Sequence, residues 1–232
     1  MTKEENSRYE RQLWVSSFGE EGQKRRAAGR LLVVGAGGLG SAALQYLCAG
    51  GVGHIGIVEY DTVSLSNLQR QTLYTTADLG APKAEIAARR LTAINPNVKI
   101  TAYPLRLTEE NSEAIFRDYD VVVDCTDNYA ARYVIDRQCG LSGIPMVYGT
   151  AQEASGQVSV FHLSGAGSYA ALYPEQVVEA GLPVGVLSPM PGIVGSIEAM
   201  ETLKILTGYG RPLAGQLLMI DAREMTFTLF RV

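Results

Sequence analysis

LLVVGAGGLG, residues Leu31–Gly40, carries the strongest structural signal in this chain. Four apolar residues that suit a buried parallel strand run directly into Gly35-x-Gly37-x-x-Gly40, and the apolar-rich Ser41–Cys48 that follows is predicted to be a helix. Glycines at these three positions permit a tight turn, a close approach of the backbone to phosphates and close helix–strand packing. The phosphates would sit at the positive N-terminal end of the helix. The stretch therefore predicts a nucleotide-binding unit of strand, loop and helix.

An acidic residue strengthens this interpretation. Glu59 ends the next predicted strand, His54–Glu59, nineteen residues after Gly40. A carboxylate at this distance is well placed to bond ribose hydroxyls. Glycines alone also make ordinary turns, so the strand, the helix and the acid together are what favour a nucleotide.

The rest of the chain alternates apolar strands with helical segments, which predicts a mostly parallel sheet with right-handed crossovers. We therefore expect an α/β fold with a Rossmann-like mixed sheet, parallel in its N-terminal part, antiparallel at its C-terminal end, and covered by helices on both faces. The predicted strands are 30–34, 54–59, 98–102, 120–125, 145–150, 157–163, 216–220 and 225–232, and the predicted helices are 38–49, 81–94, 109–117, 130–141 and 192–207. We expect one domain over residues 1–232, with residues 1–29 as an N-terminal helical arm and residues 164–183 as a mobile crossover loop.

Composition excludes several classes of protein. Hydrophobic residues make up 47% of the chain and charged residues 19%, as in globular proteins. A formal net charge of −4 argues against nucleic acid as a partner, and no apolar run is long enough for a membrane span. The charged start is not a signal peptide. Cys48, Cys125 and Cys139 are odd in number and scattered, so we expect no disulfide framework and a cytoplasmic protein.

The segment after Glu59, YDTVSLSNLQRQTLY, is unusually polar for a loop in this position. Polar groups gather beside the predicted nucleotide at Asp61, Asn67, Gln69, Arg70 and Gln71, and the Arg70 guanidinium can bind phosphate through its fork. A solvated loop with one surface arginine is the alternative. Lys83 follows Pro82 in the first turn of a helix, where its charge opposes the helix dipole. A nearby anion would explain that position, and a plain surface lysine is the alternative.

A second acidic group follows a later strand. VVVDCTDN places Asp124 and Asp127 at the carboxyl end of the strand 120–125, on the sheet edge where ligands bind. Carboxylates beside phosphates suit magnesium, and we expect Asp127 in the loop to be the more exposed of the two. Alternatively, Asp127 or Asn128 caps the next helix. Cys125 is expected to be a small buried residue rather than a nucleophile.

Five motifs together resemble a known family. RYERQ, GAGGLG, SLSNLQRQ, PKAE and DCTDN, in this order and spacing, are similar to the ThiF/MoeB/HesA group of sulfur-carrier adenylyltransferases, which are bacterial relatives of ubiquitin-activating enzymes. The resemblance extends from about Arg8 to the C-terminus. It implies ATP- and magnesium-dependent adenylation of the C-terminal Gly-Gly carboxylate of a small ubiquitin-fold sulfur-carrier protein. A separate sulfur donor then converts the acyl-adenylate to a thiocarboxylate.

The resemblance also implies roles for residues within these motifs. Gly37 and Gly38 would face the phosphates, Glu59 the ribose, and Asp127 would hold magnesium. Arg11, which RYERQ places three residues after Arg8 on one helical face, resembles an arginine that reaches into the partner subunit, and this implies a symmetric homodimer. The expected nucleotide-binding set is Gly35, Gly37, Gly38, Gly40, Glu59, Asp61, Asn67, Arg70 and Lys83, and the expected catalytic set is Arg11, Arg70, Lys83 and Asp127.

The chain departs from the family pattern in three places. Members usually carry aspartate where Glu59 stands. Many carry two CxxC pairs for a structural zinc, but here the first pair reads Ser168-Tyr169-Ala170-Ala171 and the second is missing, so we expect no zinc. Some members have a cysteine in the crossover loop that links to the carrier. The corresponding Glu179–Pro183 has none, and we therefore expect no covalent step there.

Several functional alternatives stay open. LRLTEEN and LYTTADLGAPK look closer to the thiamine branch of the family, so we expect a carrier for thiazole synthesis, with the molybdopterin synthase small subunit as the alternative. A dinucleotide-dependent oxidoreductase would leave SNLQRQ and DCTDN unexplained. A non-catalytic carrier-binding protein would leave the phosphate-site residues unexplained. Relatives that act on a tRNA base are a further possibility, which the acidic pI of about 5.3 disfavours.

Overall fold

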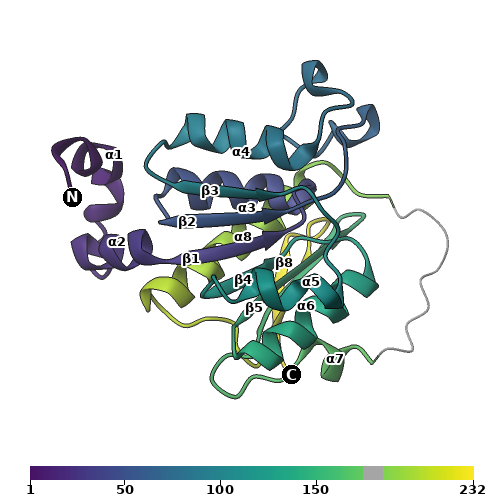
Figure 1. The fold of residues 1–232 in the computed structure, drawn as a ribbon. Helices are drawn as coiled ribbons and strands as arrows, with labels where there is room; N and C mark the ends of the chain where they lie inside the picture. Colours follow the sequence, from purple (N-terminus) through teal and green to yellow (C-terminus); the bar gives the residue numbers. More distant parts are fainter. Residues whose placement is uncertain (175–184) are drawn as a thin grey trace.

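One mixed sheet forms the centre of the structure, a computed structural model that describes residues 1–174 and 185–232 (Figure 1). Its strand order is β3-β2-β1-β4-β5-β6-β7-β8. The pairs from β3 to β5 are parallel, and those from β5 to β8 are antiparallel. The predicted fold class is therefore confirmed. The strands are β1 Arg30–Val34, β2 His54–Val58, β3 Lys99–Tyr103, β4 Val121–Asp124, β5 Met146–Gln152, β6 Ser155–Phe161, β7 Gln216–Asp221 and β8 Thr226–Arg231.

Helices cover both faces of the sheet, and this accounts for the uninterrupted apolar run in β1. Successive side chains of a strand point to opposite faces. Leu31 and Val33 belong to one buried cluster, and Leu32 and Val34 belong to the other. In Figure 1, α3, α4 and α8 lie on one face of the sheet, and α5 and α6 lie on the other. These helices are α3 Gly38–Ala49, α4 Lys83–Ile94, α8 Pro189–Thr207, α5 Glu109–Phe116 and α6 Tyr129–Ser142.

The N-terminal arm consists of α1 (Lys3–Leu13) and α2 (Gly19–Ala28), which dock on the C-terminal ends of α3 and α4. Arg26 is buried and donates from Nη2 to the Tyr46 carbonyl at 3.1 Å, and burial lowers the pKa of Arg26 to about 10. Arg8 donates from Nη1 to the Ile94 carbonyl at 3.1 Å. Cations at the carbonyl ends of helices are favourable, because these ends carry partial negative charge. Arg8 therefore anchors the arm.

Some predicted boundaries differ from the structure because capping residues set them. Pro82 is the N-cap of α4 and not a first-turn residue, so the helix begins at Lys83. α8 begins three residues earlier than predicted, with Pro189 in its first turn, where a proline is tolerated.

The predicted crossover loop, residues 164–183, is not all loop. It contains the short helix α7, Tyr169–Leu172, while residues 175–183 lie outside the described part of the chain. The remaining elements are two short 3-10 helices, η1 Leu65–Asn67 and η2 Thr76–Asp78. In the described residues, no helix is both long and apolar enough to cross a membrane.

Candidate nucleotide site

Three loops meet at the point where the strand order of the sheet reverses, between β1 and β4. β1 lies between β2 and β4, and Val34 at its end pairs with Val58 on one side and Asp124 on the other. The glycine loop after β1, Glu59 after β2 and the loop after β4 therefore share one edge of the sheet. In open α/β sheets, ligands bind at such a switch point, outside the carboxyl ends of the strands.

The glycines of the loop differ in whether the surrounding structure leaves room for a side chain. A Cβ on Gly35, whose φ is 94°, would lie 2.6 Å from the Cys125 carbonyl oxygen, and a Cβ on Gly40 would lie 2.2 Å from the Gly35 oxygen. A Cβ on Gly38 would lie 2.8 Å from Pro191 of α8. The fold itself therefore requires these three glycines. A Cβ on Gly37 would meet nothing closer than 3.4 Å, so the chain leaves space above that residue.

This difference predicts contrasting effects of two substitutions. Gly40→Ala should lower the melting temperature because its methyl group overlaps a backbone oxygen. Gly37→Ala should lower the melting temperature less but weaken ATP binding by about tenfold or more, because its methyl group occupies the space left for phosphate. Thermal denaturation and titration calorimetry measure the two effects. A Gly37→Ala variant with wild-type affinity for ATP would contradict the placement of the phosphates.

Glu59 is buried and bridges two backbone amides. Its Oε2 accepts from the Ala36 amide of the glycine loop and its Oε1 from the Asp61 amide, both at 2.9 Å. Tyr74 fixes the same loop by donating from its hydroxyl to the Ala36 carbonyl at 2.8 Å. Each carboxylate oxygen has further lone pairs, so Glu59 can accept from a ribose hydroxyl while it holds the loop.

Lys83 is held at this edge by Asp61. The Lys83 Nζ lies 3.3 Å from Oδ2 of Asp61, and the lysine side chain is 4% exposed while the aspartate side chain is 54% exposed. The first-turn position of Lys83 predicted a nearby anion, and the Asp61 carboxylate of the same chain is such an anion. An ammonium group has three donors, so Lys83 can still donate to a phosphate.

Arg70 lies against the glycine loop. Its Cγ is 3.5 Å from the position that a Cβ on Gly38 would take, and its Nη1 donates to the Ser66 carbonyl at 3.3 Å. The backbone carbonyl of Asn67 accepts from the amides of both Arg70 and Gln71 at 3.0 Å, which sets the turn that carries them. Within the described residues, Arg70 has no carboxylate partner, so most of its guanidinium fork is available to an anion.

The two aspartates after β4 differ in environment. Asp124 is buried, and its Oδ1 accepts from the Thr126 amide at 3.0 Å and the Thr126 hydroxyl at 2.6 Å. Burial raises the pKa of Asp124, and the Arg132 guanidinium opposes that rise. Asn128 caps α6 by accepting from the Ala131 amide at 2.9 Å. Asp124 therefore shapes the loop, while Asp127 is exposed and makes no hydrogen bond to the described residues.

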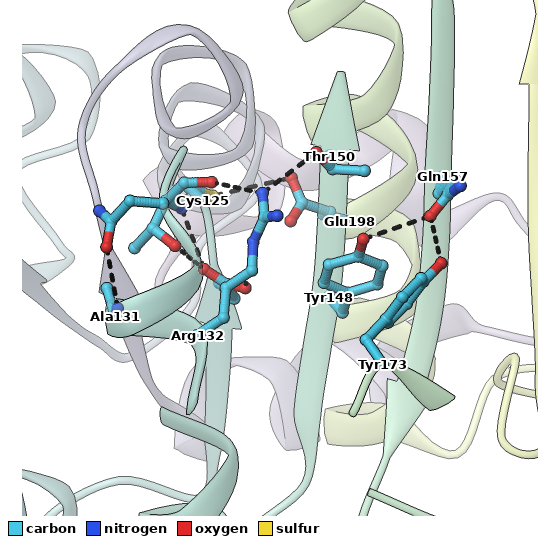
Figure 2. Close-up of polar contacts among 11 residues, drawn as sticks. Cys125, Ala131, Arg132, Tyr148, Thr150, Gln157, Tyr173 and Glu198 are labelled. Atoms are coloured by element: carbon cyan, nitrogen blue, oxygen red, sulfur yellow. Dashed lines mark hydrogen bonds and ion pairs between the residues drawn. The ribbon is translucent and has the colours of Figure 1, made fainter. Parts of the chain in front are cut away.

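Arg132 is a functional candidate that the sequence analysis missed. Its Nη2 donates to the Thr126 carbonyl at 2.9 Å and to Oγ1 of Thr150 at 3.1 Å, and its Nε lies 3.5 Å from Oδ2 of Asp124. Figure 2 shows Arg132 reaching from α6 toward Thr150 on β5. An arginine near the start of a helix opposes the helix dipole, and this signal, the one that marked Lys83, could have identified it.

A groove of about 720 Å³ begins at Arg132 and runs over the antiparallel strands. Tyr148 and Tyr173 are among the tyrosines that line it, and in Figure 2 their hydroxyls both point at Gln157. Oε1 of Gln157 accepts from them at 3.3 and 2.5 Å, respectively. The groove lies beside the loop after β4, because Arg132 lines it and also donates to the Thr126 carbonyl of that loop.

Arg11 does not join its own chain's glycine loop. Its guanidinium lies 4.5 Å from the centroid of the exposed Trp14 ring. The arm leads into the start of β1, whereas the glycine loop follows the end of that strand (Figure 1). The arm and the glycine loop therefore lie at opposite ends of β1.

Comparisons with known proteins agree with this geometry. Residues 9–232 match the model of the ThiF family. A sulfur carrier protein adenylyltransferase of Thermus thermophilus is 48% identical, over 97% of this chain and 87% of the relative. A molybdopterin-synthase adenylyltransferase of Escherichia coli is 41% identical, over 98% and 92%. The solved structure of E. coli MccB with ATP has a TM-score of 0.89 at 18% identity, over 99% of this chain and 72% of that one, which shows a shared fold.

Proposed function

We propose a function from one established premise: this chain belongs to the ThiF family, and its close relatives are adenylyltransferases. The proposed reaction is the ATP-dependent adenylation of the C-terminal carboxylate of a small ubiquitin-fold sulfur-carrier protein that ends in Gly-Gly. A separate sulfur donor would then form the thiocarboxylate. The observation that supports this most is Arg132, which joins the loop of the nucleotide site to a groove fit for an extended chain end.

The residues of the site suit this chemistry. The carrier carboxylate would attack the α-phosphorus of ATP, a new carboxylate–phosphorus bond would form, and the bond to pyrophosphate would break. The carboxylate is already ionised, so the reaction needs no general base. Asn67, Arg70 and Lys83 would align the phosphates and neutralise the charge that grows on the leaving group.

Magnesium fits this donor set. Asp127 is exposed at the sheet edge with its carboxylate unpaired among the described residues, and magnesium often takes one or two carboxylates plus substrate phosphates. The described residues contain no cluster of three metal-ligating side chains, so phosphates and water would complete the shell. Magnesium held by Asp127 would add positive charge beside the phosphates. We also propose that the protein folds without zinc, with α7 occupying the position of the first cysteine pair.

We propose that residues 1–232 form one adenylation domain that acts as a homodimer. Within the described chain, a groove of about 890 Å³ is lined mainly by apolar residues of α3 and α8, with Phe227 at its side. Tyr46, Met200 and Phe227 expose large apolar side chains. A second copy on this face would bury them, and the arm, residues 1–29, would bring Arg11 to the partner's site.

The carrier for thiazole synthesis is the proposed partner, with the molybdopterin synthase small subunit as the alternative. One relative is named for sulfur carrier proteins in general and another for molybdopterin synthase, so the names support either carrier. Family membership removes the oxidoreductase alternative. ATP–pyrophosphate exchange distinguishes the proposed enzyme from a non-catalytic carrier-binding protein.

The proposed function predicts a strict requirement for the carrier end. ATP–pyrophosphate exchange should depend on magnesium and should fall at least about a hundredfold when the last glycine of the carrier is removed, because the attacking carboxylate then stops short of the phosphate. Exchange of labelled pyrophosphate into ATP measures this with both candidate carriers. If neither intact carrier supports exchange above background, the enzyme assignment is wrong.

A further inference from the structure

Gln71 is buried at the edge of the nucleotide site, yet its carboxamide has no hydrogen-bond partner among the described residues. The residue is 4% exposed, and its Oε1 is enclosed without a partner. Its backbone is held firmly: the amide donates to the Asn67 carbonyl at 3.0 Å and the carbonyl accepts from the Tyr74 amide at 3.1 Å. No hydrogen bond of the carboxamide therefore holds the side chain in place.

The other buried glutamines in the described part of the chain each make at least one side-chain hydrogen bond. Gln23 donates from Nε2 to the Gly50 carbonyl at 3.0 Å, although its Oε1 also has no partner among the described residues. Gln138 accepts from Oγ of Ser112 at 3.2 Å and donates to Oγ of Ser142 at 2.8 Å. A buried polar group without a partner costs free energy, and an apolar side chain of similar shape would avoid that cost. The free protein thus has no visible reason to keep a carboxamide at position 71.

The direction of the side chain suggests the reason. Nε2 of Gln71 lies 3.4 Å from the position that a Cβ on Gly37 would take, and Gly37 is the loop glycine above which the chain leaves space. Arg70, the preceding residue, lies against the adjacent Gly38. An N–H donor that faces this space needs an acceptor, and a phosphate oxygen is the acceptor that the surrounding cations and loop amides would also favour.

We propose that Gln71 is a nucleotide-recognition residue whose Nε2 donates to a phosphate oxygen of the bound nucleotide above Gly37. The inference rests on the proposed function, because it requires a nucleotide at this loop. Nε2 has no hydrogen-bond partner in the free protein and gains one on binding, whereas the enclosed Oε1 stays without one, so the residue trades stability of the free protein for affinity. It would contribute a neutral donor beside the charged donors Arg70 and Lys83.

This trade can be measured with Gln71→Met, which keeps length and approximate volume but removes both polar ends. The free variant should melt about 2–4 °C above wild type, because the unpaired carboxamide is gone. Its affinity for ATP should fall by about tenfold or more, while affinity for adenosine should stay within about twofold. Thermal denaturation and titration calorimetry with ATP and adenosine provide the readouts.

Gln138→Met is the matched control, because it removes a similarly buried carboxamide that is hydrogen-bonded at both Oε1 and Nε2 and lies on α6, where it contacts Ser112 of α5. It should lower the melting temperature and leave ATP affinity unchanged. Gln71→Glu provides a second variant that keeps the shape of the side chain but places a carboxylate toward phosphate, and it should bind ATP more weakly than Gln71→Met.

The outcomes separate the proposed function of the protein from the proposed role of Gln71. A wild-type protein that binds neither ATP nor adenosine overturns the proposed function and this inference together. A wild type that binds ATP and a Gln71→Met variant that binds it equally well overturn this inference alone, since Gln71 would then only fill space. Equal losses of ATP and adenosine affinity would also overturn it, because the contact would not involve a phosphate.

Discussion

Asp127→Ala is expected to lower magnesium-dependent ATP–pyrophosphate exchange by about a hundredfold to a thousandfold, the range for removing one preorganised group from a charged transition state. Asp127 is exposed at the switch-point edge and makes no hydrogen bond to the described residues, while Asn128 already caps α6. The free energy of unfolding should therefore change little. The magnesium concentration needed for half-maximal exchange should rise.

Two controls separate this effect from a general loss of charge or structure. Asp118→Ala removes an exposed carboxylate that precedes β4, at the opposite end of that strand from Asp127, and should leave exchange unchanged. Asp124→Ala removes the acceptor of the Thr126 amide and hydroxyl and leaves Arg132 buried without its carboxylate, so it should lower the melting temperature. If Asp127→Ala exchanges at the wild-type rate and with the wild-type magnesium requirement, Asp127 has no metal role.

Mixing two inactive variants, Arg11→Ala and Asp127→Ala, is expected to restore activity. Arg11 lies on α1 of the arm that precedes β1, whereas its own glycine loop follows β1, and its guanidinium lies over the ring of the exposed Trp14. In a mixed dimer with residues supplied across the interface, one site takes both substitutions and the other takes neither. With random exchange at equal concentrations, half of the dimers are mixed, so about a quarter of all sites should be intact.

The mixing experiment needs proof that subunits exchange, which a tag on one variant and a pull-down of the other provide. Activity should rise with the fraction of mixed dimers and approach about a quarter of the wild-type rate per site. Complete exchange without any recovery would show that Arg11 acts within its own chain or only supports the arm, and the shared-site model would then be wrong.

The fold followed from local sequence patterns because the features that form it are local. The run Leu31–Val34 is apolar throughout, since helices cover both faces of β1, and the glycines after it fix the turn into α3. The observed helix boundaries differ from the predicted ones where a single capping residue sets them, as Pro82 does for α4. α7 was not predicted because it has only four helical residues and depends on distant contacts: Asp136 of α6 accepts the Tyr169 amide at 2.7 Å.

The candidate site was less predictable because its geometry depends on contacts between distant segments. The sequence placed Asp124 and Asp127 together at a strand end. Only the structure shows that Asp124 accepts hydrogen bonds from Thr126 and forms an ion pair with Arg132. The sequence indicated an anion for Lys83 without identifying Asp61 as one. The sequence marks Gln71 only as one polar residue of the loop after Glu59, because a missing hydrogen-bond partner is visible only when the neighbours are known.

The central claim is that a carrier carboxylate attacks the α-phosphorus of ATP in this site, and isotope transfer tests it directly. A carrier labelled with heavy oxygen in its terminal carboxylate is incubated with the protein, ATP and magnesium, and the product is cleaved with hydroxylamine at the carbonyl carbon. The account predicts that the released AMP carries one labelled oxygen, detected by mass spectrometry. AMP without label, formed only when the carrier is present, would show that water rather than the carboxylate is the nucleophile and would contradict the account.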